Sequence, residues 1–192
     1  MASFTEALLS STSLVAIAEM GDKTQLLSFV LASRFRGRAW PIIAGILVAT
    51  LVNHWLAAWL GGWLATTIGP VALRWILAAV FFAFAVWALI PDKLDEPVAN
   101  DGNAGAFMAS VTLFFIAEMG DKTQLATIAL AAQWSALVPV VIGTTLGMMI
   151  ANVPAVLLGE RLTRILPLKF LRWTAAALFA LFGVAILLLH DK

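Results

Sequence analysis

The sequence contains no cysteine and only two histidines, His54 and His190, among its 192 residues. Without cysteine the protein can form no disulfide, no thiolate metal site and no cysteine nucleophile. Two histidines are too few for a histidine-based metal site. Metal sites built from thiolate or imidazole ligand sets are therefore excluded.

Charged residues are also scarce. They make up 12% of the chain, against about 25% in soluble domains, and hydrophobic residues make up 62%. Long uncharged runs recur along the whole chain, which argues against a soluble helical protein with a very large core. The apolar surface is too large for a water-facing shell, so we expect an all-α integral membrane protein.

Six apolar segments are each long enough for a helix that crosses about 30 Å of hydrocarbon with about 20 residues. No alternating strand pattern is present, so these spans are predicted to be helices. They lie near residues 7–33, 40–65, 71–90, 105–133, 137–159 and 168–189. No Lys or Arg precedes Lys23, so the first segment lacks the charge pattern of a secretory signal and is expected to be retained.

The two halves of the chain are related by an internal repeat. Nine consecutive residues, Ala18–Leu26, recur unchanged as Ala117–Leu125. Chance does not produce such a match, so we predict a three-helix repeat over residues 1–90 and a second over residues 105–192. Residues 91–104 are rich in acids, Pro, Gly and Asn, and are predicted to form an acidic cytoplasmic linker.

An odd number of helices in each repeat requires the second copy to enter the membrane inverted. The basic residues agree, because they change loops between the copies. Arg34, Arg36 and Arg38 follow the first span, whereas Arg161, Arg164, Lys169 and Arg172 lie between the fifth and sixth. The positive-inside rule then places these loops in the cytoplasm and both termini outside.

Each repeat carries two acids inside an apolar run, where ionisable groups are costly and normally line a site or a water path. Glu19 and Asp22 are three residues apart, as are Glu118 and Asp121, so each pair is expected to share one helix face. An inverted pair of repeats brings the first span of each half together near the midplane. We therefore predict that all four carboxylates converge on one cation site.

Formal charge predicts what such a site exchanges. Four carboxylates and the two lysines of the motifs, Lys23 and Lys122, leave a net charge of −2. One divalent cation or two protons would neutralise it, which suggests exchange of one for the other. Further oxygen ligands are expected from Thr24, Gln25, Thr123 and Gln124. Oxygen ligands favour Ca²⁺, Mn²⁺ or Mg²⁺ over copper or zinc, and Mg²⁺ dehydrates reluctantly.

Two neighbours of the acids have alternative interpretations. Met20 and Met119 either add a soft thioether that favours Mn²⁺ or serve as apolar filler, and filler is preferred. Gly21 and Gly120 either permit close helix packing or mark a local break that exposes carbonyl groups.

The remaining polar residues within the spans are also interpreted in pairs. Lys23 and Lys122 are expected to pair with the acids in the ion-free state rather than snorkel to the interface. Asn53 and Asn152 lie in mid-span and are expected to hydrogen-bond across helices, with ligation of the cation as the alternative. His54 has no counterpart in the second repeat and is interpreted as packing.

The motif Glu-x-Gly-Asp-Lys-Thr, present at Glu19–Thr24 and again at Glu118–Thr123, resembles the motif pair of uncharacterised protein family 0016, the GDT family. The resemblance spans essentially the whole chain. It implies a cation/proton antiporter for Mn²⁺, Ca²⁺ or both, with the motif acids and lysines at its site. Bacterial members resemble manganese exporters, and the absence of a transit peptide favours a multi-pass protein of a bacterial inner membrane.

We therefore predict a secondary transporter that exports Mn²⁺ from the cytoplasm against protons, with Ca²⁺ as the alternative substrate. A passive cation channel is a competing hypothesis. A membrane enzyme is disfavoured because no nucleophile or phosphate clamp accompanies the acids. No cofactor and no nucleic-acid partner are expected, the lipid bilayer is the surrounding partner, and the choice between monomer and homodimer stays open.

Overall fold

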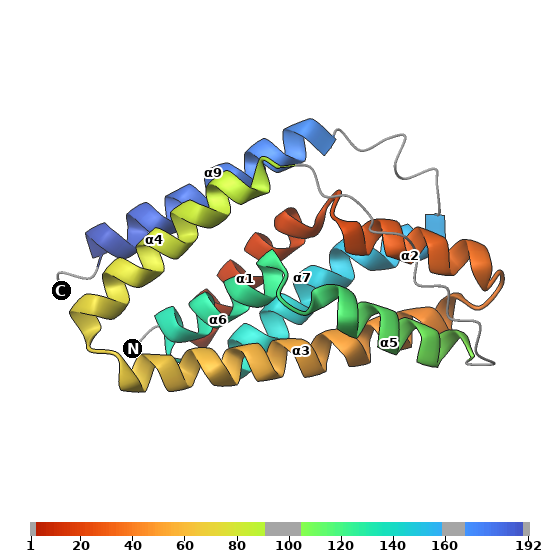
Figure 1. The fold of residues 1–192 in the computed structure, drawn as a ribbon, viewed down its shortest axis with the longest axis horizontal. Helices are drawn as coiled ribbons and strands as arrows, with labels where there is room; N and C mark the ends of the chain where they lie inside the picture. The colour runs from red at the N-terminus through yellow and green to blue at the C-terminus, as the bar shows by residue number, and fades with distance from the viewer. Residues whose placement is uncertain (1–2, 91–104, 159–167, 190–192) are drawn as a thin grey trace.

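The computed structural model describes residues 3–90, 105–158 and 168–189. These residues form helices and no strand. The helices are α1 (Phe4–Glu19), α2 (Lys23–Arg34), α3 (Ala39–Thr67), α4 (Pro70–Ala88), α5 (Ala106–Glu118), α6 (Lys122–Trp134), α7 (Leu137–Leu158) and α9 (Leu168–Leu189) (Figure 1). The predicted linker 91–104 lies outside the described residues, as do Arg161, Arg164 and His190.

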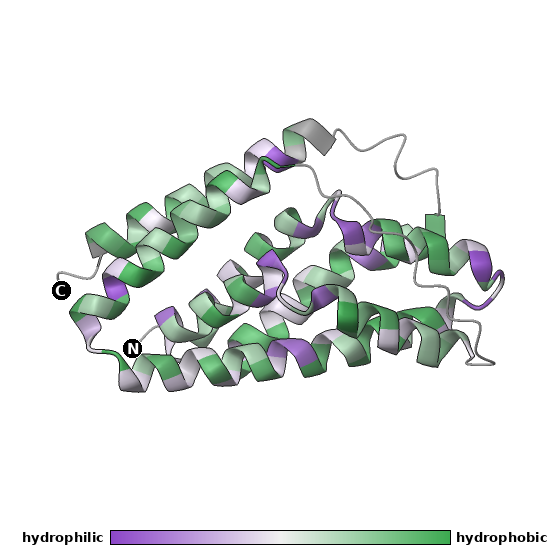
Figure 2. Cartoon of the chain, viewed as in Figure 1, coloured by the Kyte–Doolittle hydropathy of each residue, from purple (hydrophilic) through white to green (hydrophobic). Residues whose placement is uncertain are grey.

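The chain has the character of a membrane protein. Within the described residues, α3, α4 and α7 are long and apolar enough to cross a membrane, and α5 and most of α9 are shorter apolar helices. Hydrophobic residues cover most of the long helices, and hydrophilic ones gather near the middle of the molecule and at helix ends (Figure 2). The outer face of α3 carries Trp55, Trp59 and Trp63, each more than half exposed, which suits contact with lipid.

The first predicted span of each repeat is not one continuous helix, and here the prediction is wrong. Residues 7–33 divide into α1 and α2, and residues 105–133 divide into α5 and α6. Gly21 and Gly120 stand in the breaks with φ of 86° and 76°, a backbone conformation that side-chain-bearing residues rarely adopt. The glycines therefore mark local breaks, which was one of their two interpretations.

The two halves interlock. In each half the first helix packs mainly against the long helix of the other half, α1 against α7 and α5 against α3. Glycines allow this close approach, because a Cβ at Gly143 would lie 2.6 Å from Leu8 O and one at Gly45 would lie 2.6 Å from Phe107 O. The breaks of the two halves are thereby held together in the middle of the bundle.

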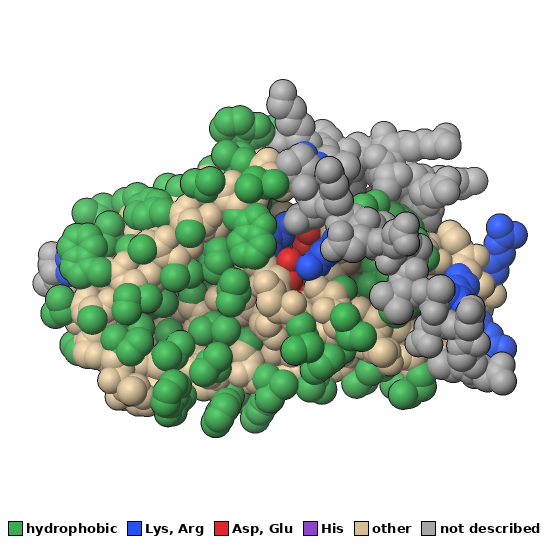
Figure 3. Space-filling view, viewed as in Figure 1, with side chains coloured by type: hydrophobic (Ala, Val, Ile, Leu, Met, Phe, Trp, Pro, Cys, Tyr) green, Lys and Arg blue, Asp and Glu red, His purple; other side chains and the backbone are tan. Residues whose placement is uncertain are grey.

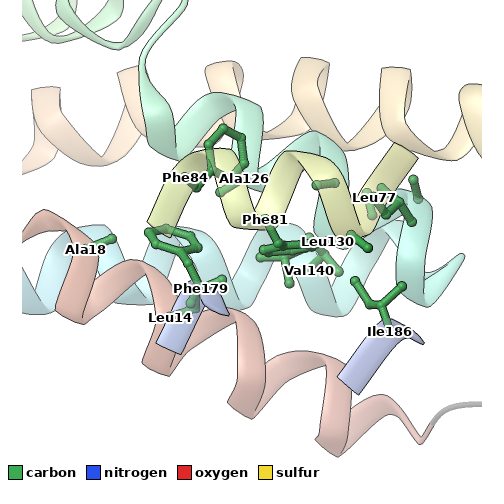
Figure 4. Close-up of a cluster of buried hydrophobic side chains, with 14 of the residues drawn as sticks. Leu14, Ala18, Leu77, Phe81, Phe84, Ala126, Leu130, Val140, Phe179 and Ile186 are labelled. Carbon is green, nitrogen blue, oxygen red and sulfur yellow. The ribbon is translucent and has the colours of Figure 1, made fainter. Parts of the chain in front are cut away.

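The helices α4 and α9 form a pair held by aromatic side chains. The rings of Phe81 and Phe182 stack at 5.6 Å, and those of Phe84 and Phe179 meet edge to face at 5.6 Å. This pair packs on α1 and α6 through a core that includes Leu14 (Figure 4). It makes few or no contacts with α2 and α5.

The crossing of α3 and α6 offers a stability test with an adjacent control. A Cβ at Gly61 would clash with the backbone carbonyl of Ile128, whereas one at Gly62 would meet open space. We expect Gly61→Ala to lower the thermal unfolding midpoint in detergent, because overpacking costs about 1–3 kcal/mol. Gly62→Ala should leave it unchanged or raise it slightly. Equal effects of the two substitutions would contradict the packing of α3 on α6.

Candidate cation site

The four motif acids lie at the two helix breaks. Glu19 and Glu118 are the last residues of α1 and α5, and Asp22 and Asp121 precede the first residues of α2 and α6. Each pair is therefore split across a break, so the prediction that its acids share one helix face is wrong. The chain turns at the glycine between them, where a regular helix cannot continue. All four acids are buried, with at most 3% of any residue exposed.

The lysines of the motifs form crossed ion pairs between the halves. Lys122 Nζ lies 3.0 Å from Asp22 Oδ1, and Lys23 Nζ lies 3.0 Å from Asp121 Oδ1. The first pair is almost fully buried, with side-chain exposures of 6% and 0%, and the second is more open, at 28% and 4%. Each lysine thus pairs with an acid of the other half rather than reaching toward a headgroup interface.

The glutamates are held by threonines of their own motif. Thr24 Oγ1 donates to Glu19 Oε2 at 2.5 Å, and Thr123 Oγ1 donates to Glu118 Oε2 at 2.9 Å. The other oxygen of each glutamate, Oε1, is buried and has no hydrogen-bond partner among the described residues. A buried carboxylate oxygen without a partner is costly, so each is suited to accept a proton or a cation.

Three of the acids can meet at a single ion. One carboxylate oxygen each of Glu19, Asp22 and Asp121 lies within 4.8 Å of the other two. Glu118, the fourth predicted ligand, is not part of this group. Carboxylate oxygens at this spacing suit a hard divalent cation such as Ca²⁺ or Mn²⁺.

The motif glutamines stabilise the breaks. Gln25 Oε1 accepts from Gly21 N–H at 3.0 Å, and Gln124 Oε1 accepts from Gly120 N–H at 2.8 Å. Their amide groups also donate away from the acids, Gln25 Nε2 to Ala151 O at 3.0 Å. At each break the glycine N–H has no helical partner. The glutamine oxygens, predicted as cation ligands, accept hydrogen bonds from these N–H groups.

The asparagines connect helices of opposite halves. Asn53 Nδ2 donates to Phe115 O at 3.2 Å, and Asn152 Oδ1 accepts from Ser28 Oγ at 2.8 Å. Of the two interpretations, hydrogen bonding across helices is the one that the geometry shows. Sequence reasoning missed Ser28, although its position one turn after Thr24, on the same helix face, was a usable signal.

The residues interpreted as packing, the two methionines and His54, differ in exposure. Met119 is 61% exposed, and Met20 is half-buried beside Gly21. His54 is fully buried in α3, and neither ring nitrogen has a hydrogen-bond partner among the described residues.

Acids and lysines buried at helix breaks, inside a helical bundle whose surface suits lipid, are typical of membrane transporters. The family model described as "Divalent cation/proton antiporter GDT1" matches residues 7–96 and 106–192, and the chain belongs to this family. The family resemblance predicted from the motifs is thereby confirmed.

Curated relatives align with most of the chain. A Vibrio cholerae protein named "Putative manganese exporter" is 52% identical over 176 residues, which cover 91% of this chain and 87% of that protein. "GDT1-like protein 5" of Arabidopsis thaliana is 28% identical over 226 residues, with 98% of both chains covered. A GDT1-like protein of Synechocystis is 29% identical over 192 residues, covering 89% of this chain and 91% of that one. No solved structure matches the chain.

Proposed function

We propose that the protein is a secondary active antiporter of a bacterial inner membrane, exporting Mn²⁺ from the cytoplasm in exchange for protons. The observation that carries this proposal is the group formed by Glu19, Asp22 and Asp121, whose carboxylate oxygens lie within 4.8 Å of one another. The group joins the breaks of both halves, so an ion bound there contacts both repeats.

The crossed ion pairs supply a physical reason for coupling. The ammonium groups of Lys122 and Lys23 hold Asp22 and Asp121, each at 3.0 Å. A divalent cation that binds these aspartates competes with the lysines for the same oxygens. Protons on Glu19 and Glu118 would compete as well, because a cation and a proton neutralise the same buried charge. Cation and protons are therefore expected to occupy the site alternately.

The choice between Mn²⁺ and Ca²⁺ rests on the relatives rather than on a sulfur ligand. Met119 is 61% exposed, so its thioether gives no support to Mn²⁺, and we do not rest the choice on Met20. An all-oxygen site is compatible with either ion. We favour Mn²⁺ because the name of the Vibrio cholerae relative specifies a manganese exporter, and Ca²⁺ is the alternative main substrate.

The proposal includes six membrane crossings in two inverted repeats, residues 1–90 and 105–192, with α1–α2 and α5–α6 each acting as one broken span. Two observations support it. The chain runs through α1 and α2 in one direction along the molecule and through α5 and α6 in the other. The start of α1 and the end of α9 lie at the same end, which we assign to the outside.

The test is an assay in proteoliposomes that contain a reporter of internal pH. Addition of Mn²⁺, Ca²⁺ or Mg²⁺ outside, without an imposed voltage, should move protons for the transported ions and rank the three. The Glu19→Gln variant should give no proton movement. Metal flux without any proton movement would overturn antiport and favour a channel, and absence of metal flux would overturn cation transport by this chain.

A further inference from the structure

Equivalent positions of the two breaks differ in exposure. Around the second break, Ile116 and Met119 are 55% and 61% exposed, and Gly120 is exposed as well. Their counterparts Ile17 and Met20 are partly buried. Two identical sequence motifs thus have different surroundings, so the difference arises from what packs against them.

The α4–α9 pair accounts for this difference. It packs on α1 and α6, which lie at one end of the bundle, and has few or no contacts with α2 and α5 at the other end. The pair therefore diverges from the rest of the bundle toward the end where α2 finishes and α5 begins (Figure 1). If the two repeats exchanged their conformations, the α4–α9 pair would pack on α2 and α5 instead. The internal repeat therefore permits two arrangements of the pair, and the structure shows one of them.

A hollow lies between the first break and the α4–α9 pair. It is lined by Asp22 and Lys122 of the site, by Ile17, Ala18, Met20 and Gly21 of the break, and by Ala88, Arg172 and Ala175 of α4 and α9. Asp22 is the one acid among the lining residues, and Arg172 and Lys122 are the cations. In the space-filling view, acidic and basic side chains show through one small opening in a hydrophobic face (Figure 3).

We propose that this hollow is the entrance through which the cation reaches Asp22 in this conformation, and that Arg172 is a positioning residue that sets the apparent affinity from that side. This inference rests on the proposed function. Arg172 adds a positive charge to a hollow that already holds Lys122. A divalent cation entering there is repelled by both, in surroundings where apolar walls screen charge weakly.

Weak binding at the entrance has a functional consequence. A cation held only by acids would leave slowly, whereas a nearby fixed charge lowers its residence time without removing any ligand. Arg172 reaches the hollow from α9, the helix that packs on α1 in this arrangement. Movement of the α4–α9 pair would carry this charge away from Asp22.

The absence of native cysteine makes a charge test direct. In the 192-residue chain, Arg172→Cys carries the only thiol, so thiol reagents can set the charge at this position. A methanethiosulfonate with a trimethylammonium group restores a positive charge, and one with a sulfonate group adds a negative charge. The measured quantities are KM and kcat for Mn²⁺-driven proton movement in proteoliposomes.

We expect unmodified Arg172→Cys to lower KM about tenfold, the cationic adduct to bring it back to within about twofold of wild type, and the anionic adduct to lower it further. The control is the same series at Arg36, an exposed residue between α2 and α3, where all charge states should give the wild-type KM. KM values at position 172 that do not follow charge would overturn the assignment of Arg172, since a purely structural role does not depend on the sign of the adduct.

Thiol reactivity separates this inference from the proposed function. Arg172→Cys should react with water-soluble reagents, and Mn²⁺ should slow that reaction, whether or not protons move. No reaction at Arg172→Cys would overturn the entrance. Protection of the Arg172→Cys thiol by Mn²⁺, combined with a wild-type protein that moves no protons, would overturn the antiport mechanism and leave the entrance supported.

Discussion

Glu19→Gln should abolish proton-coupled Mn²⁺ transport while the protein still inserts and folds. Glutamine keeps the side-chain volume and can still accept the hydrogen bond from Thr24, so the packing around α1 is preserved. It removes the negative charge of one of the three acids that share an ion site. Loss of even an outer partner of a metal ligand costs 10–100-fold in affinity, so loss of this ligand should cost at least about 100-fold in transport.

The matched control is Glu6→Gln. Glu6 is exposed near the start of α1, and glutamine can keep its hydrogen bond to Ser3 N–H in the capping box. Transport by this variant should equal that of the wild type. Wild-type transport by a well-folded Glu19→Gln protein would show that the acid group is not the transport site.

Loss of Lys122 should destabilise the protein far more than loss of Lys23. Both lysines pair with an aspartate at 3.0 Å, but the side chain of Lys122 is 6% exposed and that of Lys23 is 28% exposed. Removing one partner of a buried pair costs about 3–5 kcal/mol, and the cost is smaller where one partner is open to solvent, because water screens the charge. Thermal unfolding of Lys122→Gln and Lys23→Gln in the same detergent measures the difference.

The double variant Asp22→Asn/Lys122→Gln separates charge from shape. It removes both charges of the buried pair and should regain much of the stability lost in Lys122→Gln, although it should not transport. A double variant no more stable than Lys122→Gln, or equal losses for the two lysines, would show that charge pairing does not hold the halves together at this point.

The sequence predicted the parts of the site that depend on residue type. Burial of Glu19 and Asp22 could be inferred from the apolar runs around them, because charge inside such runs needs a partner. The pairing of Lys23 and Lys122 with acids could be inferred for the same reason, because an unpaired charge inside an apolar run is costly. The family followed from the repeated motif, and the family model confirms it.

The break at Gly21 could not be decided from the sequence. An apolar run with acids three residues apart fits a continuous helix as well as two short ones, and glycine is compatible with both. The choice depends on whether the freed backbone amides find partners. Those partners include Gln25 Oε1 for Gly21 N–H and Gln124 Oε1 for Gly120 N–H.

By itself the sequence determined the membrane character of the chain, its internal repeat and the chemistry of its acids, because composition, repetition and residue type need no coordinates. The tertiary structure decided which acids share an ion, that each lysine crosses to the other half, and that the α4–α9 pair packs on one end of the bundle. Two copies of one motif are identical in sequence, and only the packing of the α4–α9 pair makes their surroundings different.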